Sequence, residues 1–428
     1  MTFAAPEPSV SNENEPEAQL VPLTSPAAGI PELITTSTQL DDYVAKLRAA
    51  TGPVAVDAER ASGYKYSQRA YLVQVRRNGA GTALIDPIAL PDLSAISQAT
   101  SEAVWILHAA DQDLRCLAEV GMVPNKLFDT ELAGRLLGYE RVGLAAVVAQ
   151  LLGLELAKEH SAADWSRRPL PESWLNYAAL DVEVLIEVYD QMYAELQATN
   201  KLAWAEEEFE AIRTAPPPPP RTDPWLRTSG VHKVRDQRGL AIVRGLWYER
   251  DRIAQRRDIT PSRVLTDKAI VSAAIARPKN LTELTKLPVF GGPRQRRGAG
   301  RWFRIIEKTY RLQPSELPTQ KRQREGPPHQ RYWKERDPQA FGRLTAARAV
   351  ATQLSEKHHI PVENLMQPDA LRRFCWEPPV AVLNDPAGEQ AFAAAAEMLR
   401  GLSVRSWQID LLIPPILQAW SQKEAGAK

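Results

Sequence analysis

Cysteine is scarce in this sequence, and long apolar runs are absent. Only Cys116 and Cys375 occur among 428 residues, which excludes a disulfide framework and a zinc site made by cysteines alone. No apolar run reaches the roughly 18 residues that a membrane-spanning helix needs. The N-terminal stretch is acidic and proline-rich, without the basic start and apolar segment of a secretion signal. We therefore expect a cytoplasmic protein in a reducing compartment, with no membrane partner.

The net charge of +1 hides a strong asymmetry along the chain. Residues 1–220 carry a net charge of −15, residues 221–336 one of +17, and residues 337–428 one of −1. A basic segment has affinity for phosphates, whereas an acidic segment needs bound cations before it can approach nucleic acid. Charge alone leaves open a simpler alternative, in which the unequal charge only solvates different domains.

Proline-rich stretches divide the chain into parts. The run APPPPP at 215–220 is expected to form an extended polyproline II spacer, and the polar, Arg-rich stretch at 318–330 marks a second boundary. The predicted organisation is a disordered acidic tail (1–29), a large first domain (30–212), a proline-rich linker (213–226), a helical domain (227–316), a basic linker (317–334) and a second helical domain (335–424).

The first domain combines helices and strands, which predicts an α/β fold. Its longest helical stretch covers 173–197, and short apolar or alternating runs predict strands at 53–59, 71–77, 82–87 and 104–109. The two later domains are predicted to be all-α. Segments 257–270 and 359–371 share one pattern, in which a polar helix end and an Ile-Pro or Ile-Thr-Pro sequence precede a short loop and a new helix. This similarity predicts a duplicated helical module.

Two carboxylates lie at the end of the first predicted strand. Asp57 and Glu59 are two residues apart, so the period of a strand places both on one face. Like charges held together are costly unless cations bind between them. The simpler alternative is a polar strand end with two hydrated acids, and this pair alone does not decide between them.

A third acid follows the last predicted strand. That strand delivers His108, and a helix then begins for which Asp111 is placed as the N-cap. Asp113 is then free in the first turn to project toward the strand ends, although it could equally be a favourable charge at a helix N-terminus. We expect His108 to form a hydrogen bond at the strand end and not to bind a metal.

A tyrosine and a fourth acid share one helix face. Tyr177 and Asp181 are four residues apart in the long predicted helix, with apolar residues on either side. An acid in that place needs a partner, unless it lies hydrated at the edge of the apolar stripe. Just upstream, Trp165, Arg167 and Arg168 form an unusual mixture for a simple loop.

In this order, with Asp-x-Glu on a strand, Asp at a strand-to-helix turn and Tyr-x3-Asp on a helix, the sequence resembles ribonuclease D. That family belongs to the tyrosine subclass of the DEDD superfamily of 3′-to-5′ exonucleases. Further blocks across residues 30–210 follow the order and spacing of the family: LVQV, LIDP, HAADQDL, FDTELAGRLLG, DWSRRPL and YAALDV. The first motif departs from the family, which commonly has Asp-Thr-Glu and then an apolar or aromatic residue, because this chain has Ala58 and Arg60. The acids are intact, but side chains that would contact the terminal nucleotide are replaced.

The resemblance implies a ribonuclease H-like 3′-to-5′ exonuclease domain that uses two divalent metal ions, Mg²⁺ or Mn²⁺. Asp57, Glu59 and Asp181 would hold the ion that carries the attacking water, and Asp57 and Asp113 would hold the second ion at the leaving group. Tyr177 would orient the water. The substrate would be an RNA with an accessible 3′ end, in the processing of stable RNA such as transfer RNA precursors, and we expect a monomer.

The helical modules resemble the helicase-and-ribonuclease-D C-terminal (HRDC) domain, which binds nucleic acid. The first copy holds most of the basic charge, and its segment 291–302 is predicted to be a phosphate-binding loop at a helix start, with a solvated basic face as the alternative. The second copy is nearly neutral, and we expect it to pack or to act as a spacer. The predicted nucleic-acid-binding residues are Arg250, Arg256, Arg257, Arg294, Arg296, Arg297 and Arg301.

Two alternative functions stay open at this point. The same kind of site serves DNA exonucleases, which a comparison of RNA and DNA product ladders would separate. An adaptor that binds nucleic acid through an inactive nuclease fold is disfavoured, because all five catalytic positions are filled.

Overall fold

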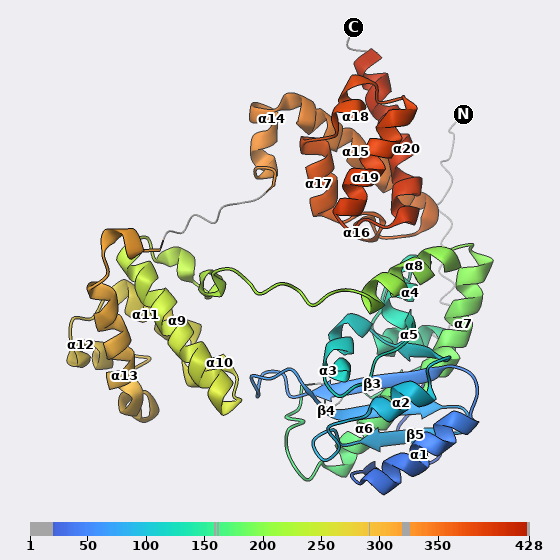
Figure 1. Ribbon diagram of the computed structural model, residues 1–428, viewed down its shortest axis with the longest axis horizontal. Helices are drawn as coiled ribbons and strands as arrows, with labels where there is room; N and C mark the ends of the chain where they lie inside the picture. The colour runs from blue at the N-terminus through green and yellow to red at the C-terminus, as the bar shows by residue number, and fades with distance from the viewer. Residues whose placement is uncertain (1–19, 158–159, 161, 291, 319–325, 426–428) are drawn as a thin grey trace, which may run out of the picture.

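The computed structural model describes residues 20–157, 160, 162–290, 292–318 and 326–425 (Figure 1). It contains an α/β domain and two groups of helices, which we call the first helical module (η2 to η4, 224–316) and the second helical module (η5 to α20, 330–425). Most of the predicted disordered tail, residues 1–19, lies outside the described part. None of the described helices is both long enough and apolar enough to cross a membrane.

A six-stranded mixed sheet forms the centre of the α/β domain. The central strand β3 runs antiparallel to β4 and parallel to β6. Val54 and Val56 of β3 pack against helices on one face of the sheet, and Ala55 packs with Val182 and Leu185 on the other, so the strand is buried on both sides. The strand order is β2 (Leu33–Ile34), β5 (Gly81–Ile85), β4 (Ala70–Arg77), β3 (Val54–Arg60), β6 (Val104–Leu107) and β7 (Lys126–Asp129).

Eight helices of the α/β domain surround the sheet in the described residues. They are α1 (Ser37–Ala49), α2 (Ser94–Ala99), α3 (Leu114–Ala118), α4 (Thr130–Leu137), α5 (Leu144–Leu152), α6 (Glu172–Glu183), α7 (Leu185–Ala198) and α8 (Leu202–Arg213). Helix α6 packs on β3, β4 and β5, whereas α7 packs on α4 and α5. The chain therefore changes direction between these two helices.

The prediction of one uninterrupted helix over 173–197 is wrong, because the helix breaks at Val184. Glu183, next to the break, is buried and anchored to the body of the domain. Its carboxylate accepts hydrogen bonds from Arg76 at 3.0 Å and from the backbone N–H of Ala27 at 3.2 Å. These tertiary contacts stabilise the corner between α6 and α7. The residue pattern within the predicted helix does not indicate them.

The sequence analysis missed four short strands. They are β2 and β7, at the two edges of the central sheet, together with β1 (Val21–Leu23) and β8 (Leu154–Leu156), which pair in parallel as a separate two-stranded sheet. The predicted disordered tail is therefore wrong for residues 21–23. Unlike the longer apolar run that predicted β6, these segments of two to four residues are too short to show a period of two, so only their distant partners identify them.

The two helical modules share one succession of elements, a long helix followed by a short one, as the duplicated sequence pattern predicts. Helices α9 and α15 have 21 residues each, and α10 and α16 have 4 each. The first module consists mainly of α9 (Gln237–Arg257), α10 (Pro261–Val264), α11 (Asp267–Ala276), α12 (Leu281–Lys286) and α13 (Pro293–Tyr310). The second has α14 (Trp333–Arg336), α15 (Pro338–His358), α16 (Val362–Leu365), α17 (Pro368–Trp376), α18 (Val380–Asn384), α19 (Glu389–Gly401) and α20 (Ser406–Ala425).

The first module has its own hydrophobic core and contacts the α/β domain through the corner between α9 and α10. Asp258, at the C-cap of α9, accepts a hydrogen bond from the backbone N–H of Ser67 at 2.9 Å. The N–H of Thr260 donates to the carbonyl of Tyr64 at 3.0 Å. This corner thus lies against the loop that joins β3 to β4.

The second module uses the equivalent corner, between α15 and α16. Lys201 of the α/β domain donates hydrogen bonds to the carbonyl of His358, at 2.6 Å, and to that of Leu136, at 2.7 Å. A Cβ atom on Gly138 would lie 2.3 Å from the carbonyl oxygen of His359, so only glycine permits this approach. The buried apolar residues of this module and of the α/β domain form one continuous cluster.

Candidate active site

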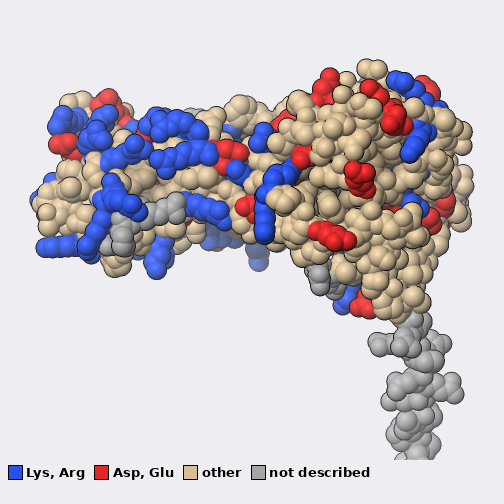
Figure 2. Space-filling model, turned by 90° about the horizontal axis from the view of Figure 1, so that it is seen from below, with Lys and Arg blue, Asp and Glu red and all other residues tan. Residues whose placement is uncertain are grey.

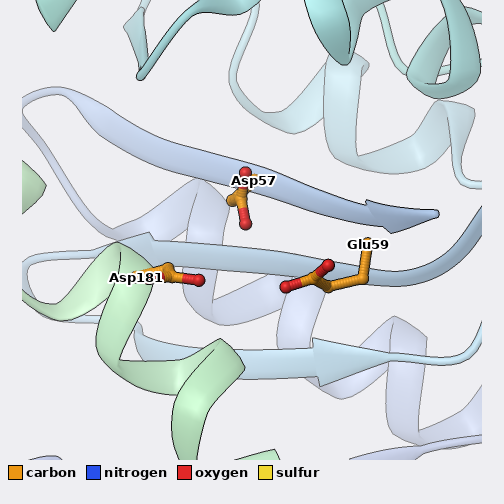
Figure 3. A group of neighbouring side chains, drawn as sticks. All are labelled: Asp57, Glu59 and Asp181. Carbon is orange, nitrogen blue, oxygen red and sulfur yellow. The ribbon is translucent and has the colours of Figure 1, made fainter. Parts of the chain in front are cut away.

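Three carboxylates converge between the central strand and α6 (Figure 3). Asp57 and Glu59 project from one face of β3, and Asp181 projects from α6, which packs on that strand. One oxygen of each carboxylate lies within 4.8 Å of those of the other two. The fold thus brings together three of the four acids selected from the sequence.

Burial is the main cause of a raised pKa for each of these three carboxyl groups. The charge of Asp57 raises the pKa of Glu59 and of Asp181 further, because like charges close together disfavour ionisation. The ionised cluster is therefore costly unless a cation lies among its oxygens. Since hard divalent cations such as Mg²⁺ and Mn²⁺ prefer oxygen ligands, the residues present fit such an ion.

Asp113 is the fourth selected acid, and it stands outside the group of three. It immediately precedes α3, yet its side chain caps no backbone N–H of that helix. Its Oδ1 atom lies 3.4 Å from Nε of Arg60. Burial, and next the charge of Asp57, raise the pKa of Asp113 to about 8, against the opposing effect of Arg60.

The prediction that Asp111 caps this helix is wrong. Asp111 is exposed and lies in a one-turn 3₁₀ helix, η1 (Ala110–Gln112), which precedes α3. The intervening turn shifts the helix start by two residues, from the predicted 112 to Leu114, so Asp113 occupies the capping position without capping. Its carboxylate is thereby left available to other groups.

Asp129 is a buried acid whose role the sequence analysis missed. It accepts hydrogen bonds from the N–H groups of Ala109, at 3.1 Å, and Ala110, at 2.8 Å, and so holds the turn that precedes Asp113. The same carboxylate caps α4 through the N–H groups of Glu131 and Leu132. Burial raises the pKa of Asp129 to about 6. An Asp-Thr pair before a helix is an N-cap signal, but the link to the other turn is visible only in three dimensions.

Tyr177 lies one helical turn before Asp181 and hydrogen-bonds to its carboxylate. Burial and the charges of Asp181 and Glu59 raise the pKa of this phenol well above its usual value. The hydroxyl therefore stays protonated at neutral pH. The ring lies in an aromatic cluster with Trp165, which is fully buried, and Trp174.

Arg168 has a structural role in the loop before α6. Its guanidinium donates to both carboxylate oxygens of Asp86, at 2.8 and 2.7 Å, and to the carbonyl of Tyr71 at 2.8 Å. This pair joins two of the sequence blocks, LIDP and DWSRRPL. Arg167, beside it, is exposed.

His108 forms a hydrogen bond, as expected, between its Nδ1 and the hydroxyl of Thr130 at 2.9 Å. Burial lowers its pKa to about 4, so the ring is neutral at physiological pH. It is absent from the three-residue carboxylate group.

Lys and Arg side chains cover much of the first helical module on the face seen in Figure 2, on the left of that view. A cavity of about 720 Å³ lies between α9, α10 and α13. Four arginines and a tryptophan are among the residues that line it: Arg257, Arg297, Arg301, Arg304 and Trp302. Such a basic hollow suits phosphate groups.

Two predictions for this module need correction. Arg250 is buried, and its guanidinium donates to Asp267 at 2.5 Å and to the carbonyl of Leu265 at 3.1 Å, so it supports the fold and is not available to RNA. The supposed phosphate-binding loop is helical from Pro293 onward, because Pro occupies the first turn of α13 after Gly292 as N-cap.

The remaining predicted arginines differ in their surroundings. Arg256 and Arg296 are exposed. Arg301 lies 3.9 Å from Glu249 as well as lining the cavity. The side chain of Arg294 lies outside the part that the structure describes.

Three family models match the chain in the order of its folded parts. Residues 31–197 match a model described as a 3′-5′ exonuclease, residues 239–306 match the HRDC domain, and residues 326–420 match a model described as a 3′ to 5′ exonuclease C-terminal domain. The second module thus matches a model other than HRDC, although its long and short helices follow the same order as α9 and α10 of the first. Fold, carboxylates and models together define a 3′-to-5′ exonuclease.

Curated relatives show to which family of 3′-to-5′ exonucleases the chain belongs. The chain is 36% identical over 272 residues to ribonuclease D of Jannaschia, which covers 60% of this chain and 68% of the relative. It is 31% identical over 296 residues to ribonuclease D of Zymomonas mobilis, with 67% and 74% covered. The chain belongs to the ribonuclease D family.

Solved structures agree with this assignment. A protein from Bifidobacterium adolescentis superimposes with a TM-score of 0.85 at 38% identity, over 94% of this chain and all of that one. Ribonuclease D of Escherichia coli gives a TM-score of 0.64 at 25% identity, over 87% and 98% of the two chains. The protein is accordingly a hydrolase, a 3′-to-5′ exoribonuclease, and its family and acidic cluster indicate dependence on divalent metal.

Proposed function

We propose that this exoribonuclease removes nucleotides hydrolytically from the 3′ ends of structured, stable RNA such as transfer RNA precursors, with two Mg²⁺ or Mn²⁺ ions. The observation that carries the proposal is the convergence of Asp57, Glu59 and Asp181 within 4.8 Å, with Tyr177 hydrogen-bonded to Asp181. The Escherichia coli relative is described as an exoribonuclease involved in structured RNA processing, which supports this substrate class.

The acids divide into two sets. Asp57, Glu59 and Asp181 would hold one cation, and Asp57 and Asp113 would hold the other. When bound, such a pair of cations supplies activation of the attacking water and neutralises the charge that develops on the departing 3′ oxygen. Without cations the ionised carboxylates repel the phosphate of the substrate, so the site is inert.

Tyr177 orients the attacking water. Its phenol stays protonated, because burial and the neighbouring carboxylates raise its pKa, so it acts through a hydrogen bond and not as a base. Its contact with Asp181 fixes the direction of the hydroxyl. Asp129 contributes indirectly, because it stabilises the turn that precedes Asp113.

The basic cavity of the first module binds the body of the RNA while the 3′ end enters the acidic domain. Arg257, Arg297 and Arg304 are the exposed arginines that line it, whereas the fourth, Arg301, is half-buried and lies 3.9 Å from Glu249. The second module, which is nearly neutral, shares its apolar core with the α/β domain and supports that domain. We also propose that the protein is a monomer and that it is located in the cytoplasm.

The test is a product ladder. A structured RNA with a 3′ single-stranded overhang and a 5′ label is incubated with the full chain in Mg²⁺ or Mn²⁺, beside a DNA of the same sequence. We expect successive one-nucleotide shortening of the RNA, no products with chelator, and slower shortening of the DNA. Internal cuts, or equal rates on RNA and DNA, would contradict the proposal.

A further inference from the structure

Arg60 occupies an irregular position on the central strand, directly after Glu59. The pairing of β3 with β4 shifts at this point, since Glu59 lies opposite Leu72 whereas Arg60 lies opposite Ala70. Tyr71 is thus the extra residue of a β-bulge. Bulges change the direction of neighbouring side chains and are frequent beside active sites. Regular alternation along β3 therefore does not fix the direction of Arg60.

The guanidinium of Arg60 contacts Asp113, the selected acid that lies outside the group formed by Asp57, Glu59 and Asp181. Its Nε lies 3.4 Å from Oδ1 of Asp113, and its Nη2 donates to the Gln112 side chain at 3.4 Å. The Arg60 side chain is 24% exposed and that of Asp113 is 9% exposed, so the ion pair lies at the edge of the buried site. Asp113 consequently faces a positive charge that belongs to the chain.

The charge of Arg60 acts on more than Asp113. It also opposes the burial that raises the pKa of Asp57 and of Glu59. A cation in this position partly compensates the acidic cluster before any metal arrives. It also competes with a metal for the carboxylate of Asp113.

We propose that Arg60 is a positioning residue and internal counter-cation of the active site, which holds Asp113 and competes with the divalent ion shared by Asp113 and Asp57. This inference rests on the two-cation site of the proposed function. The second ion binds only when Arg60 leaves Asp113. Arg60 therefore weakens mainly the second binding step, because it contacts Asp113 directly, and affects the first, at Asp57, Glu59 and Asp181, much less.

The experiment is a calorimetric titration of the full chain with Mn²⁺, in the absence of RNA, on the unmodified protein and on Arg60→Gln. We expect two binding steps, of which the weaker becomes about fivefold tighter in Arg60→Gln, the size that a partly exposed ion pair supports. Arg60→Lys, which keeps the charge, should stay close to the unmodified protein. Arg115→Gln removes the same charge from an exposed position on α3 and serves as the matched control.

The outcomes separate the inference from the function on which it rests. Equal affinities for Arg60→Gln and the unmodified protein, or weaker binding in Arg60→Gln, would overturn the role of Arg60 while leaving the metal site in place. Tighter binding in Arg115→Gln of the same size would also overturn it, because any loss of charge would then suffice. If the unmodified chain and Asp57→Asn both bound no Mn²⁺, the proposed metal site would be wrong, and so would the proposed role of Arg60.

Thermal unfolding of the same variants gives a second readout. Without metal, Arg60→Gln should unfold at a lower temperature than Arg115→Gln, because the cluster loses its compensating charge. Addition of Mn²⁺ should raise the unfolding temperature of Arg60→Gln more than that of the unmodified chain. An equal rise in both would contradict competition between Arg60 and the ion.

Discussion

Asp181 combines two contacts in one carboxylate, because it belongs to the acidic group and accepts the hydrogen bond of Tyr177. We expect Asp181→Asn to lower the rate of RNA shortening by at least about 100-fold, since the amide keeps the shape but loses the charge of a metal ligand. Affinity for RNA should change little. Single-turnover rates and filter binding measure the two effects.

The matched control for this variant is Asp190→Asn, an exposed aspartate on α7. It should shorten RNA at the rate of the unmodified enzyme. Substantial turnover of Asp181→Asn in Mg²⁺ would show that Asp181 is not a metal ligand.

Tyr177→Phe should be milder than the loss of any carboxylate. The water keeps its position near the acids and loses one orienting hydrogen bond, so we expect a rate lower by about tenfold. The pH dependence of the rate should not lose a titrating group, because the phenol is protonated throughout. A rate equal to that of the unmodified enzyme would reduce Tyr177 to a packing residue of α6.

His108 should make the stability of the folded chain depend on pH in the mildly acidic range. Its pKa is lowered by burial from 6.5 to about 4, so the unfolded chain takes up a proton below about 6.5 that the folded chain accepts only near 4. The stabilising contribution of the neutral ring is thus lost as the pH falls through this window. The difference in unfolding temperature between the unmodified chain and His108→Gln should therefore shrink between about pH 7 and pH 5. A difference independent of pH would exclude His108 as the titrating group.

At the scale of elements, Asp129 connects the end of β7, the start of α4 and the turn before Asp113. Asp129→Ala removes the acceptor of four backbone N–H groups and should destabilise the α/β domain by about 2 kcal/mol. Asp129→Asn should cost less, because its amide oxygen still accepts. Denaturant unfolding gives the stability. Unchanged stability of Asp129→Ala, with unchanged activity, would show that the turn does not depend on this carboxylate.

The sequence was informative wherever one element carried its own signal. The central strand with Asp57 and Glu59, the one-turn spacing of Tyr177 and Asp181, and the repeated helix pattern of the modules all depend on local periodicity. The break at Val184, the strands β1, β2, β7 and β8, and the double role of Asp129 depend on partners distant in the chain. The burial of Arg250 is of the same kind, since Asp267 lies on the next long helix. Composition identified the basic module but could not separate its exposed arginines from its structural one.

At the scale of the whole molecule, acidic and basic parts are joined through contacts as well as through the linker. Because the second module shares its apolar core with the α/β domain, truncation after Ala215 would expose core residues. Substitutions in the full chain are therefore a better test of whether the first module binds the RNA body while the α/β domain accepts its 3′ end. Replacing Arg257, Arg297 and Arg304 with Gln should weaken binding of a long structured RNA. The slope of log affinity against log salt should flatten by about 0.9 for each phosphate that the variant no longer neutralises.

The rate on a short single strand should not change in this triple variant, because the acids lie in the other part of the chain. Replacement of the exposed arginines Arg48, Arg115 and Arg141 of the α/β domain provides a control with the same loss of charge. Identical salt slopes for the unmodified chain and the cavity variant would mean that the cavity does not contact RNA.

The central claim is that the carboxylates around Asp57 act on the terminal phosphate through divalent cations. The most direct test is the single-turnover rate on an RNA whose last linkage carries sulfur in place of one non-bridging phosphate oxygen, measured in Mg²⁺ and in Mn²⁺. Since Mn²⁺ accepts sulfur more readily than Mg²⁺ does, we predict slow removal of the last nucleotide in Mg²⁺ and recovery in Mn²⁺ for one of the two stereoisomers. Removal that persists in chelator, or that proceeds at equal rates in both metals for both stereoisomers, would contradict the account.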